Sequence, residues 1–173
     1  INYNFYKNAK AIITQSTFHK GIVGRNLLIN NIISVSGNLW TLKDLKFLRE
    51  MSKVDKNGEC AILDSKISHK NTREAIKYCR AKNLKYNLVS SSNYHEFLSK
   101  LGRNKKFVFL PKTPETLSRV CVESRMMNMG TIVNKNVGAS HEEWFKMKGE
   151  ELIDYMINKR DEISQTIEGI INE

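Results

Sequence analysis

The chain has 173 residues, of which 40% are hydrophobic and 27% are charged, and its formal net charge is +10. This length accommodates one ordinary domain, or one domain with part of another, and the composition excludes a disordered chain. No apolar run approaches the roughly 18 residues that a membrane-spanning helix requires. The opening residues lack the apolar core of a signal peptide and an initiator Met. We therefore expect a fragment of a longer protein without a transmembrane segment.

The positive charge is compatible with nucleic acid, an anionic membrane surface or a phosphate-bearing substrate as partner. The lysines are spread along the chain, and Lys, Asn and Ile are all abundant, as in proteins from AT-rich genomes.

Cys60, Cys79 and Cys121 lie far apart and show no C-x-x-C spacing, which argues against a disulfide framework or a zinc site. We expect reduced core cysteines in a cytoplasmic protein.

Segments rich in apolar and β-branched residues are predicted as strands, at residues 10–16, 31–37, 60–65, 85–91, 106–111 and 130–135. Most of them lack polar–apolar alternation, which is typical of strands buried on both faces of a parallel sheet. Amphipathic helical patterns alternate with them, at residues 41–51, 71–83, 93–102 and 149–172. The sequence therefore predicts an α/β fold, with a Rossmann-like open parallel sheet and helices on both faces.

Ligands of such sheets bind beyond the carboxyl ends of the strands. The loops at residues 64–71, 90–94, 111–116 and 134–144 follow predicted strands and hold much of the polar and glycine-containing loop chemistry. His69 and His141 lie in these loops, and we expect both to be structural. A dinucleotide-binding G-x-G-x-x-G turn is missing, which argues against a dehydrogenase.

Pro111 and Pro114, the only prolines, separate the strand at 106–111 from an apolar helix that we expect to begin between Glu115 and Ser118. The first turn of a helix leaves unpaired backbone N–H groups, and these form an anion site together with the helix dipole. Ser118 and Arg119 could add a hydroxyl and a charge to such a site.

Glu115, Arg119 and Glu123 follow one another at four-residue spacing on this otherwise apolar helix. A buried carboxylate must be paired or used. Two interpretations remain open: a structural Glu–Arg–Glu ladder, or an edge of the helix that borders a ligand cleft.

The segment also resembles a known family. Glu115 and Glu123, with seven residues between them, are similar to the paired-glutamate signature of retaining glycosyltransferases with the GT-B fold, especially the large family 4. In that family the signature follows a strand that ends in Pro, enters a helix, and is followed by a strand and a Gly-containing loop with a Glu. The corresponding parts here are "FVFLP", "PETLSRVCVESRMMNMG", "TIVNK" and "VGASHEE".

The resemblance implies roles for individual residues. Glu115 would contact hydroxyls of the donor sugar, and Glu123 would bind the ribose of the nucleotide. The backbone amides of Thr116, Leu117 and Ser118 would hold the sugar and the diphosphate, although the family usually has glycines after the first glutamate.

A loop after an earlier strand carries an arginine and a lysine for the diphosphate in this family. Lys70 matches the lysine, whereas the arginine falls near Ser65, where Lys66 would substitute for it. Fixed positive charge favours departure of a diphosphate without a metal ion. We therefore expect no metal site, and no cofactor besides the nucleotide-diphosphate sugar as donor substrate.

The resemblance also implies a domain organisation. Residues 1–52 would be a remnant of the acceptor-side domain with the hinge, 53–150 a nucleotide-sugar-binding domain, and 151–173 a C-terminal helix that crosses back. A missing N-terminal domain would hold the acceptor, a glycan or DNA, so this chain should bind a nucleotide sugar but be inactive alone. The alternative, based on the net charge, is a basic α/β domain that binds nucleic acid.

Overall fold

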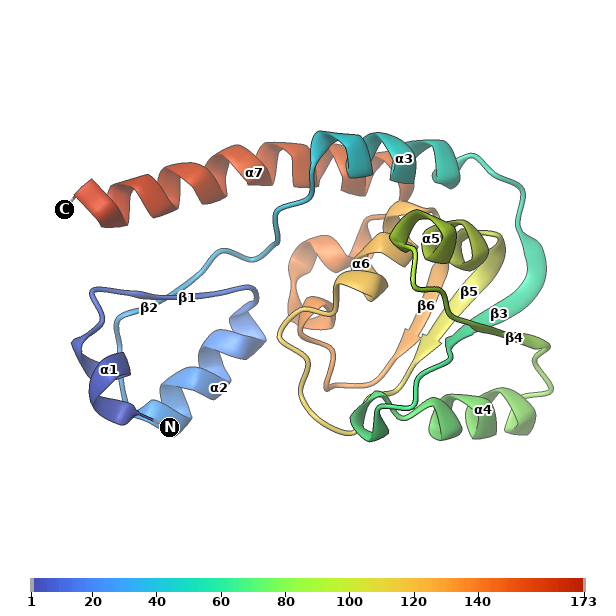
Figure 1. The fold of residues 1–173 in the computed structure, drawn as a ribbon, viewed down its shortest axis with the longest axis horizontal. Helices are drawn as coiled ribbons and strands as arrows, with labels where there is room; N and C mark the ends of the chain where they lie inside the picture. Colours follow the sequence, from blue (N-terminus) through green and yellow to red (C-terminus); the bar gives the residue numbers. More distant parts are fainter. Residues whose placement is uncertain (1, 173) are drawn as a thin grey trace.

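The structure is a computed structural model that describes residues 2–172 (Figure 1). Its helices and strands alternate along most of the chain, as the sequence predicts. In chain order they are α1 (Tyr3–Asn8), β1 (Ile12–Thr14), α2 (Thr17–Leu27), β2 (Ile32–Ser34), α3 (Leu42–Ser52), β3 (Asn57–Leu63), η1 (Ser68–Lys70), α4 (Thr72–Ala81), β4 (Tyr86–Val89), α5 (Tyr94–Gly102), β5 (Asn104–Phe109), α6 (Arg119–Met126), β6 (Gly130–Val133), η2 (Gly138–His141), η3 (Glu143–Lys146) and α7 (Gly149–Asn172).

The strands form two parallel sheets. A four-stranded sheet has the order β4-β3-β5-β6, and β1 and β2 form a separate two-stranded sheet. Each predicted strand segment overlaps one of these strands, although β3 and β5 begin before the predicted segments 60–65 and 106–111. The carboxyl ends of β3, β5 and β6 lie at the same edge of the larger sheet because all its strands are parallel.

Helices cover both faces of the four-stranded sheet, which confirms the predicted Rossmann-like α/β fold (Figure 1). Alternate residues of a strand point to opposite faces. Cys60 and Ile62 of β3 pack with Ala75 and Cys79 of α4 on one face. Ala61 packs on the other face, in the larger core that α3, α5, α6 and α7 complete. The apolar run of β3 is thus divided between two cores.

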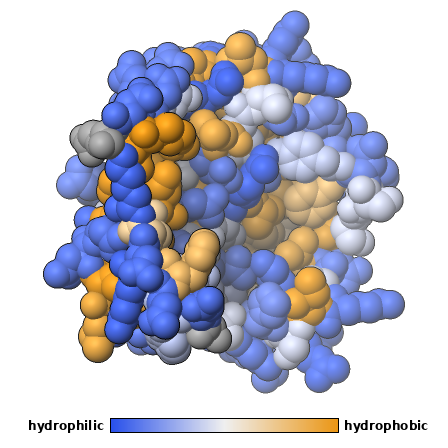
Figure 2. All heavy atoms as spheres, turned by 60° about the vertical axis from the view of Figure 1, so that its left-hand side comes forward, coloured by the Kyte–Doolittle hydropathy of each residue, from blue (hydrophilic) through white to orange (hydrophobic). Residues whose placement is uncertain are grey.

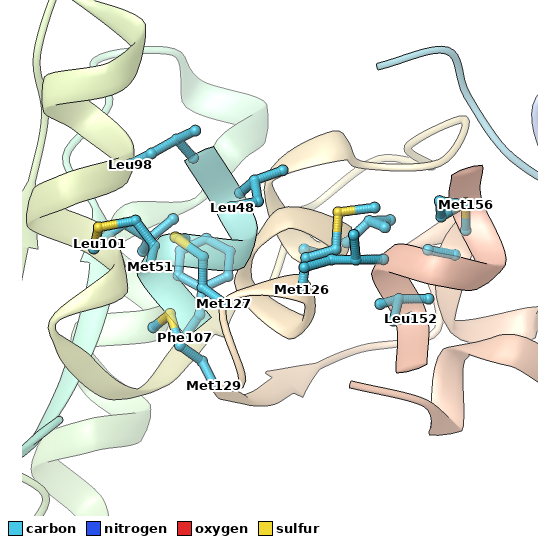
Figure 3. Close-up of a cluster of buried hydrophobic side chains, with 14 of the residues drawn as sticks. Leu48, Met51, Leu98, Leu101, Phe107, Met126, Met127, Met129, Leu152 and Met156 are labelled. Carbon is cyan, nitrogen blue, oxygen red and sulfur yellow. The ribbon is translucent and has the colours of Figure 1, made fainter. Parts of the chain in front are cut away.

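Methionine, leucine and phenylalanine side chains fill much of the larger core (Figure 3). Met126, Met127 and Met129 are completely buried there. Gly102 at the end of α5 makes room for them, since an added Cβ would lie 2.7 Å from Sδ of Met127 and 2.8 Å from the methyl carbon of Met51. The adaptable methionine side chains fill the space between the helices and β5.

The elements α1, β1, α2 and β2, which we call the N-terminal unit, lie beside the larger sheet (Figure 1). The sequence did not predict α1, a short helix whose first turn is capped by Asn2. Several apolar side chains of this unit are exposed, including Phe5 at 67% and Leu28 at 86%. Figure 2, which brings this side forward, shows hydrophobic side chains interrupting a largely hydrophilic surface.

Helix α7 runs from α3 towards the N-terminal unit (Figure 1). It reaches the connection that follows β2, where an added Cβ at Gly37 would lie 3.0 Å from Cγ of Lys159. None of the helices within residues 2–172 combines the length and the apolar character needed to cross a bilayer.

Candidate functional site

The loop after β5 runs alongside the loop after β6 at the carboxyl edge of the larger sheet. Glu115 forms an isolated parallel bridge with Val137. Its N–H donates to the carbonyl oxygen of Asn136 at 2.7 Å, and its own carbonyl accepts from the N–H of Gly138 at 3.0 Å. These bonds extend the sheet by one residue pair and fix the backbone of Glu115 at its edge.

The side chain of Glu115 pairs with Lys70, which lies on the loop after β3. Nζ of Lys70 is 2.9 Å from Oε1 and 3.0 Å from Oε2 of Glu115. The side chains of Lys70 and Glu115 are 26% and 15% exposed, so the pair is mostly shielded but still reachable from solvent. The structure therefore brings together these two predicted site residues, although they are distant in sequence.

The backbone carbonyl groups in the segment from Thr116 to Ser118 accept hydrogen bonds from other parts of the chain. The carbonyl of Leu117 accepts from the N–H of Ala139 at 3.0 Å, and that of Thr116 accepts from the hydroxyl of Ser16. The N–H groups of Thr116, Leu117 and Ser118, in contrast, donate to no acceptor in the part of the chain that the structure describes. Unpaired backbone donors of this kind suit an anion or a hydroxyl oxygen.

Helix α6 begins later than the sequence predicts. Its first residue is Arg119, and Ser118 before it adopts a left-handed backbone conformation with φ 69°. The bridge to Val137 holds Glu115 in an extended conformation, so Glu115 does not share a helical edge with Arg119 and Glu123. Of the two open interpretations, the three-residue ladder is therefore wrong for Glu115. The pair between Arg119 and Glu123 is present, because Nε of Arg119 lies 3.3 Å from Oε1 of Glu123.

Glu123 is buried in a polar network between α3, α5 and α6, and its side chain is only 3% exposed. Its Oε1 accepts hydrogen bonds from Nε1 of Trp40 at 3.0 Å and from the hydroxyl of Tyr94 at 2.9 Å, besides the contact with Arg119. Burial, together with the neighbouring carboxylate of Glu123, raises the pKa of Tyr94. The phenol therefore remains a hydrogen-bond donor.

Arg119 covers this network from the solvent side, with its side chain 46% exposed. Its guanidinium carbon lies 5.4 Å from the ring centroid of Trp40 and 5.9 Å from that of Tyr94, which are cation–π distances. The sequence did not indicate that Trp40 and Tyr94 contact Glu123. The donors come from residues 83 and 29 positions away, and no local pattern reports such contacts.

Lys66 lies in a different hollow from Glu115. It lines a cavity of about 460 Å³ beside the start of α4, together with Ser65, Ser68, Arg73, Lys112 and other residues of the same loops. Three cationic side chains and no carboxylate line this hollow, so it favours anions.

A second hollow separates α2 from the Glu115 loop, with a volume of about 160 Å³. Phe18, His19 and Ile22 line it from α2, and Pro114, Glu115 and Thr116 line it from the opposite side. His19 is a site candidate that sequence reasoning missed, and its position within an unremarkable helix gives no signal. Burial lowers the pKa of His19 below its usual 6.5, which favours the neutral ring.

The histidines of the predicted loops have other surroundings. The ring of His141 stacks on Phe18 at 4.3 Å, and its Nε2 lies 2.9 Å from the carbonyl oxygen of Lys135. His69 is exposed, and its carbonyl oxygen accepts from the N–H of Lys112. Within residues 2–172 there is no group of three or more His, Cys, Asp or Glu side chains with an arrangement that could hold a metal ion.

No protein-family model matches this chain, and no curated protein matches it either. Among solved structures, it is similar to a glycosyltransferase from Rickettsia africae ESF-5, with a TM-score of 0.48 and 13% sequence identity. The similarity covers 98% of this chain and 56% of the Rickettsia protein, so the chain spans little more than half the length of that relative.

Proposed function

We propose that this chain is the donor-binding half of a retaining glycosyltransferase, which transfers a sugar from a nucleotide-diphosphate donor. Residues 53–150 would form the nucleotide-sugar-binding domain, 1–52 the acceptor-side remnant with the hinge, and 151–173 the C-terminal helix. The observation that carries this proposal is the position of Glu115. Its carboxylate pairs with Lys70 at the carboxyl edge of the sheet and borders the hollow that faces α2.

The surroundings of Glu115 match the chemistry of a sugar diphosphate. A carboxylate accepts hydrogen bonds from sugar hydroxyls, and the unpaired N–H groups of Thr116, Leu117 and Ser118 can donate to phosphate oxygens. Lys70 would face the charge that develops on the diphosphate as the glycosidic bond breaks. Such an interaction favours the transition state over the ground state and lowers the barrier.

Lys66 would add positive potential from the neighbouring hollow, which it shares with Arg73 and Lys112. Because Lys66 and Lys70 belong to one short loop after β3, a diphosphate near Lys70 would lie within the field of both.

Glu123 would bind the ribose through its second carboxylate oxygen. All three donors of the network contact Oε1, and Oε2 accepts no hydrogen bond from the described residues. Arg119 would have to turn away from Glu123 to admit the nucleotide. The Arg119 side chain is 46% exposed and can turn into solvent, while Trp40 and Tyr94 continue to donate hydrogen bonds to the buried carboxylate of Glu123.

A calorimetric titration tests the proposal with UDP and GDP, each as the free nucleotide and as its common sugar derivatives. We expect binding of at least one nucleotide, weakened about tenfold by Lys70→Met, which removes a charged contact with the diphosphate. Lys77→Met is the matched control, because the Lys77 side chain is 76% exposed on α4. Glu115→Gln should reduce the affinity for the sugar derivative and not that for the free nucleotide. The absence of heat with every nucleotide would reject the function.

A second function has one observation in its favour. The hollow lined by Lys66, Arg73 and Lys112, on a chain of net charge +10, also suits the phosphate backbone of a nucleic acid. This function predicts binding of DNA or RNA whose affinity falls steeply with salt and decreases in Lys112→Met. Nucleotide binding without such a salt dependence would leave the transferase as the better assignment.

A further inference from the structure

His19 has an environment that the fold itself does not explain. It lies in the first turn of α2, where its N–H donates to Oγ of Ser16 at 3.1 Å. Its ring atom Nδ1 is buried, yet it has no hydrogen-bond partner among residues 2–172. Buried polar side-chain atoms are nearly always paired, so an unpaired one requires an explanation.

The hollow beside His19 is small, and both apolar and polar side chains line its walls. Phe18, Ile22 and Pro114 provide apolar surface, while His19, Glu115 and Thr116 provide polar groups. Its volume of about 160 Å³ corresponds to roughly five water molecules at ~30 Å³ each. A single sugar ring matches this mixture, since it has apolar faces and a rim of hydroxyl groups.

We propose that His19 is a substrate-binding residue, which hydrogen-bonds a hydroxyl of the donor sugar from the side of the hollow opposite Glu115. This inference rests on the proposed function and adds the residue through which the N-terminal unit contacts the sugar. The α2 wall and the Glu115 loop would then hold the same ring from two sides.

The chemistry of the imidazole suits this role. Burial lowers its pKa, so the ring is neutral near pH 7 and offers one donor and one acceptor nitrogen. A hydroxyl group can satisfy either nitrogen. A neutral ring also leaves the pairing of Glu115 with Lys70 unchanged, whereas an imidazolium would compete with Lys70 for the carboxylate.

Other histidines show what a structural histidine looks like in this protein. Nε2 of His95 lies 3.0 Å from Oδ1 of Asp44, and its ring stacks on Phe47. His141 stacks on Phe18 and contacts a backbone carbonyl. His19 differs from both, since its ring combines burial with a nitrogen that no described residue satisfies.

Calorimetry on the 173-residue chain tests this inference, with UDP and GDP as free nucleotides and as UDP-glucose, UDP-N-acetylglucosamine and GDP-mannose. His19→Phe keeps an aromatic ring against Ile22 and removes both nitrogens. The expected result is an unchanged affinity for the free nucleotide and a loss of about three- to tenfold for its sugar derivative. His141→Phe is the matched control and should change neither affinity.

The outcomes separate the two proposals. Free-nucleotide binding with equal sugar-nucleotide affinities in the parent and in His19→Phe would overturn the role of His19 and leave the proposed function intact. Absence of binding to every nucleotide would overturn both. Should His19→Phe prove unstable, NMR of the parent decides: the His19 ring signals should shift with the sugar nucleotide and not with the free nucleotide. Unshifted signals would overturn the inference.

Discussion

Thr17 and Glu142 join the N-terminal unit to the larger sheet. Both the N–H and the hydroxyl of Thr17 donate to Oε1 of Glu142, at 2.6 and 2.8 Å. The other carboxylate oxygen accepts from the hydroxyl of Ser36, which also accepts a hydrogen bond of 2.9 Å from Nε1 of Trp144. Glu142 thus caps the start of α2 with a negative charge and fixes the connection after β2.

Glu142→Ala should therefore loosen the attachment of the N-terminal unit. The substitution leaves the two donor groups of Thr17 and the hydroxyl of Ser36 without their acceptor, in a place where Glu142 is only 7% exposed. We expect a loss of about 2 kcal/mol in the free energy of unfolding, measured by urea denaturation. Trypsin should also cut α2 faster, at Lys20 or Arg25.

Glu143→Ala provides the matched control for this experiment. Glu143 is adjacent in sequence and exposed, so its removal should change the free energy of unfolding by less than about 0.5 kcal/mol. Equal effects of the two substitutions would contradict the role of Glu142 at the junction.

Gly138→Ala should disturb the segment that carries the unpaired amides. A Cβ at Gly138 would lie 2.2 Å from the carbonyl oxygen of Thr116, a backbone atom that cannot move alone. We expect a loss of about 2 kcal/mol or more in stability from this overpacking, and weaker nucleotide binding, because Thr116 and Glu115 must shift. Thermal unfolding and calorimetry measure the two effects.

Gly58→Ala is the control for Gly138→Ala, since a Cβ at Gly58 would meet no atom within 4 Å. Both substitutions add the same methyl group, so the difference between them reports the crowding at Gly138 by Thr116 and by Oγ of Ser16. A Gly138 variant as stable as the Gly58 variant would show that this loop adapts freely.

The fold was predictable because its signals are local. The strands are short apolar runs such as 106–111, and most of the helices between them show caps and apolar faces that any sequence window reveals. The buried, reduced state of Cys60, Cys79 and Cys121 was also predicted correctly. The helix α1 was missed, because its only structural signal is the cap provided by Asn2 and its apolar residues are exposed.

The geometry of the candidate site was predictable only in part. The pattern around Pro114 pointed to Glu115, and the structure places Lys70 against it. The start of α6 depends on the bridge between Glu115 and Val137. Val137 lies far from Pro114 in the sequence, so the local pattern around Pro114 could not reveal this bridge. His19 has no sequence signal at all, since its proposed role depends on a hollow that α2 forms together with the Glu115 loop.

The cysteines should be unreactive in the folded protein. Burial raises the pKa of Cys79 to about 11 and that of Cys121 to about 12, and it also raises that of Cys60. At pH 8 only about one Cys79 in a thousand would be a thiolate, the form that attacks a disulfide reagent. An aromatic disulfide reagent should therefore label the chain slowly in buffer and rapidly in concentrated guanidinium. Fast labelling of one thiol in buffer would contradict this burial.

Glu123→Ala should destabilise the protein more than any change at an exposed glutamate. Nε1 of Trp40 and the hydroxyl of Tyr94 would lose their acceptor, and Trp40 is only 1% exposed, so water cannot replace it without opening the core. We expect a loss of about 3 kcal/mol in the free energy of unfolding.

Glu123→Gln should lose only about 1 kcal/mol, because its amide oxygen can still accept from Trp40 and Tyr94. Glu168→Ala, at an exposed position of α7, should stay within about 0.5 kcal/mol of the parent. Urea denaturation measures all three variants, and nucleotide calorimetry on the stable Gln variant then separates structure from ligand binding. Full stability of Glu123→Ala would mean that the network does not hold α3 and α5 against α6, whereas unchanged nucleotide affinity in Glu123→Gln would remove Glu123 from the ribose site.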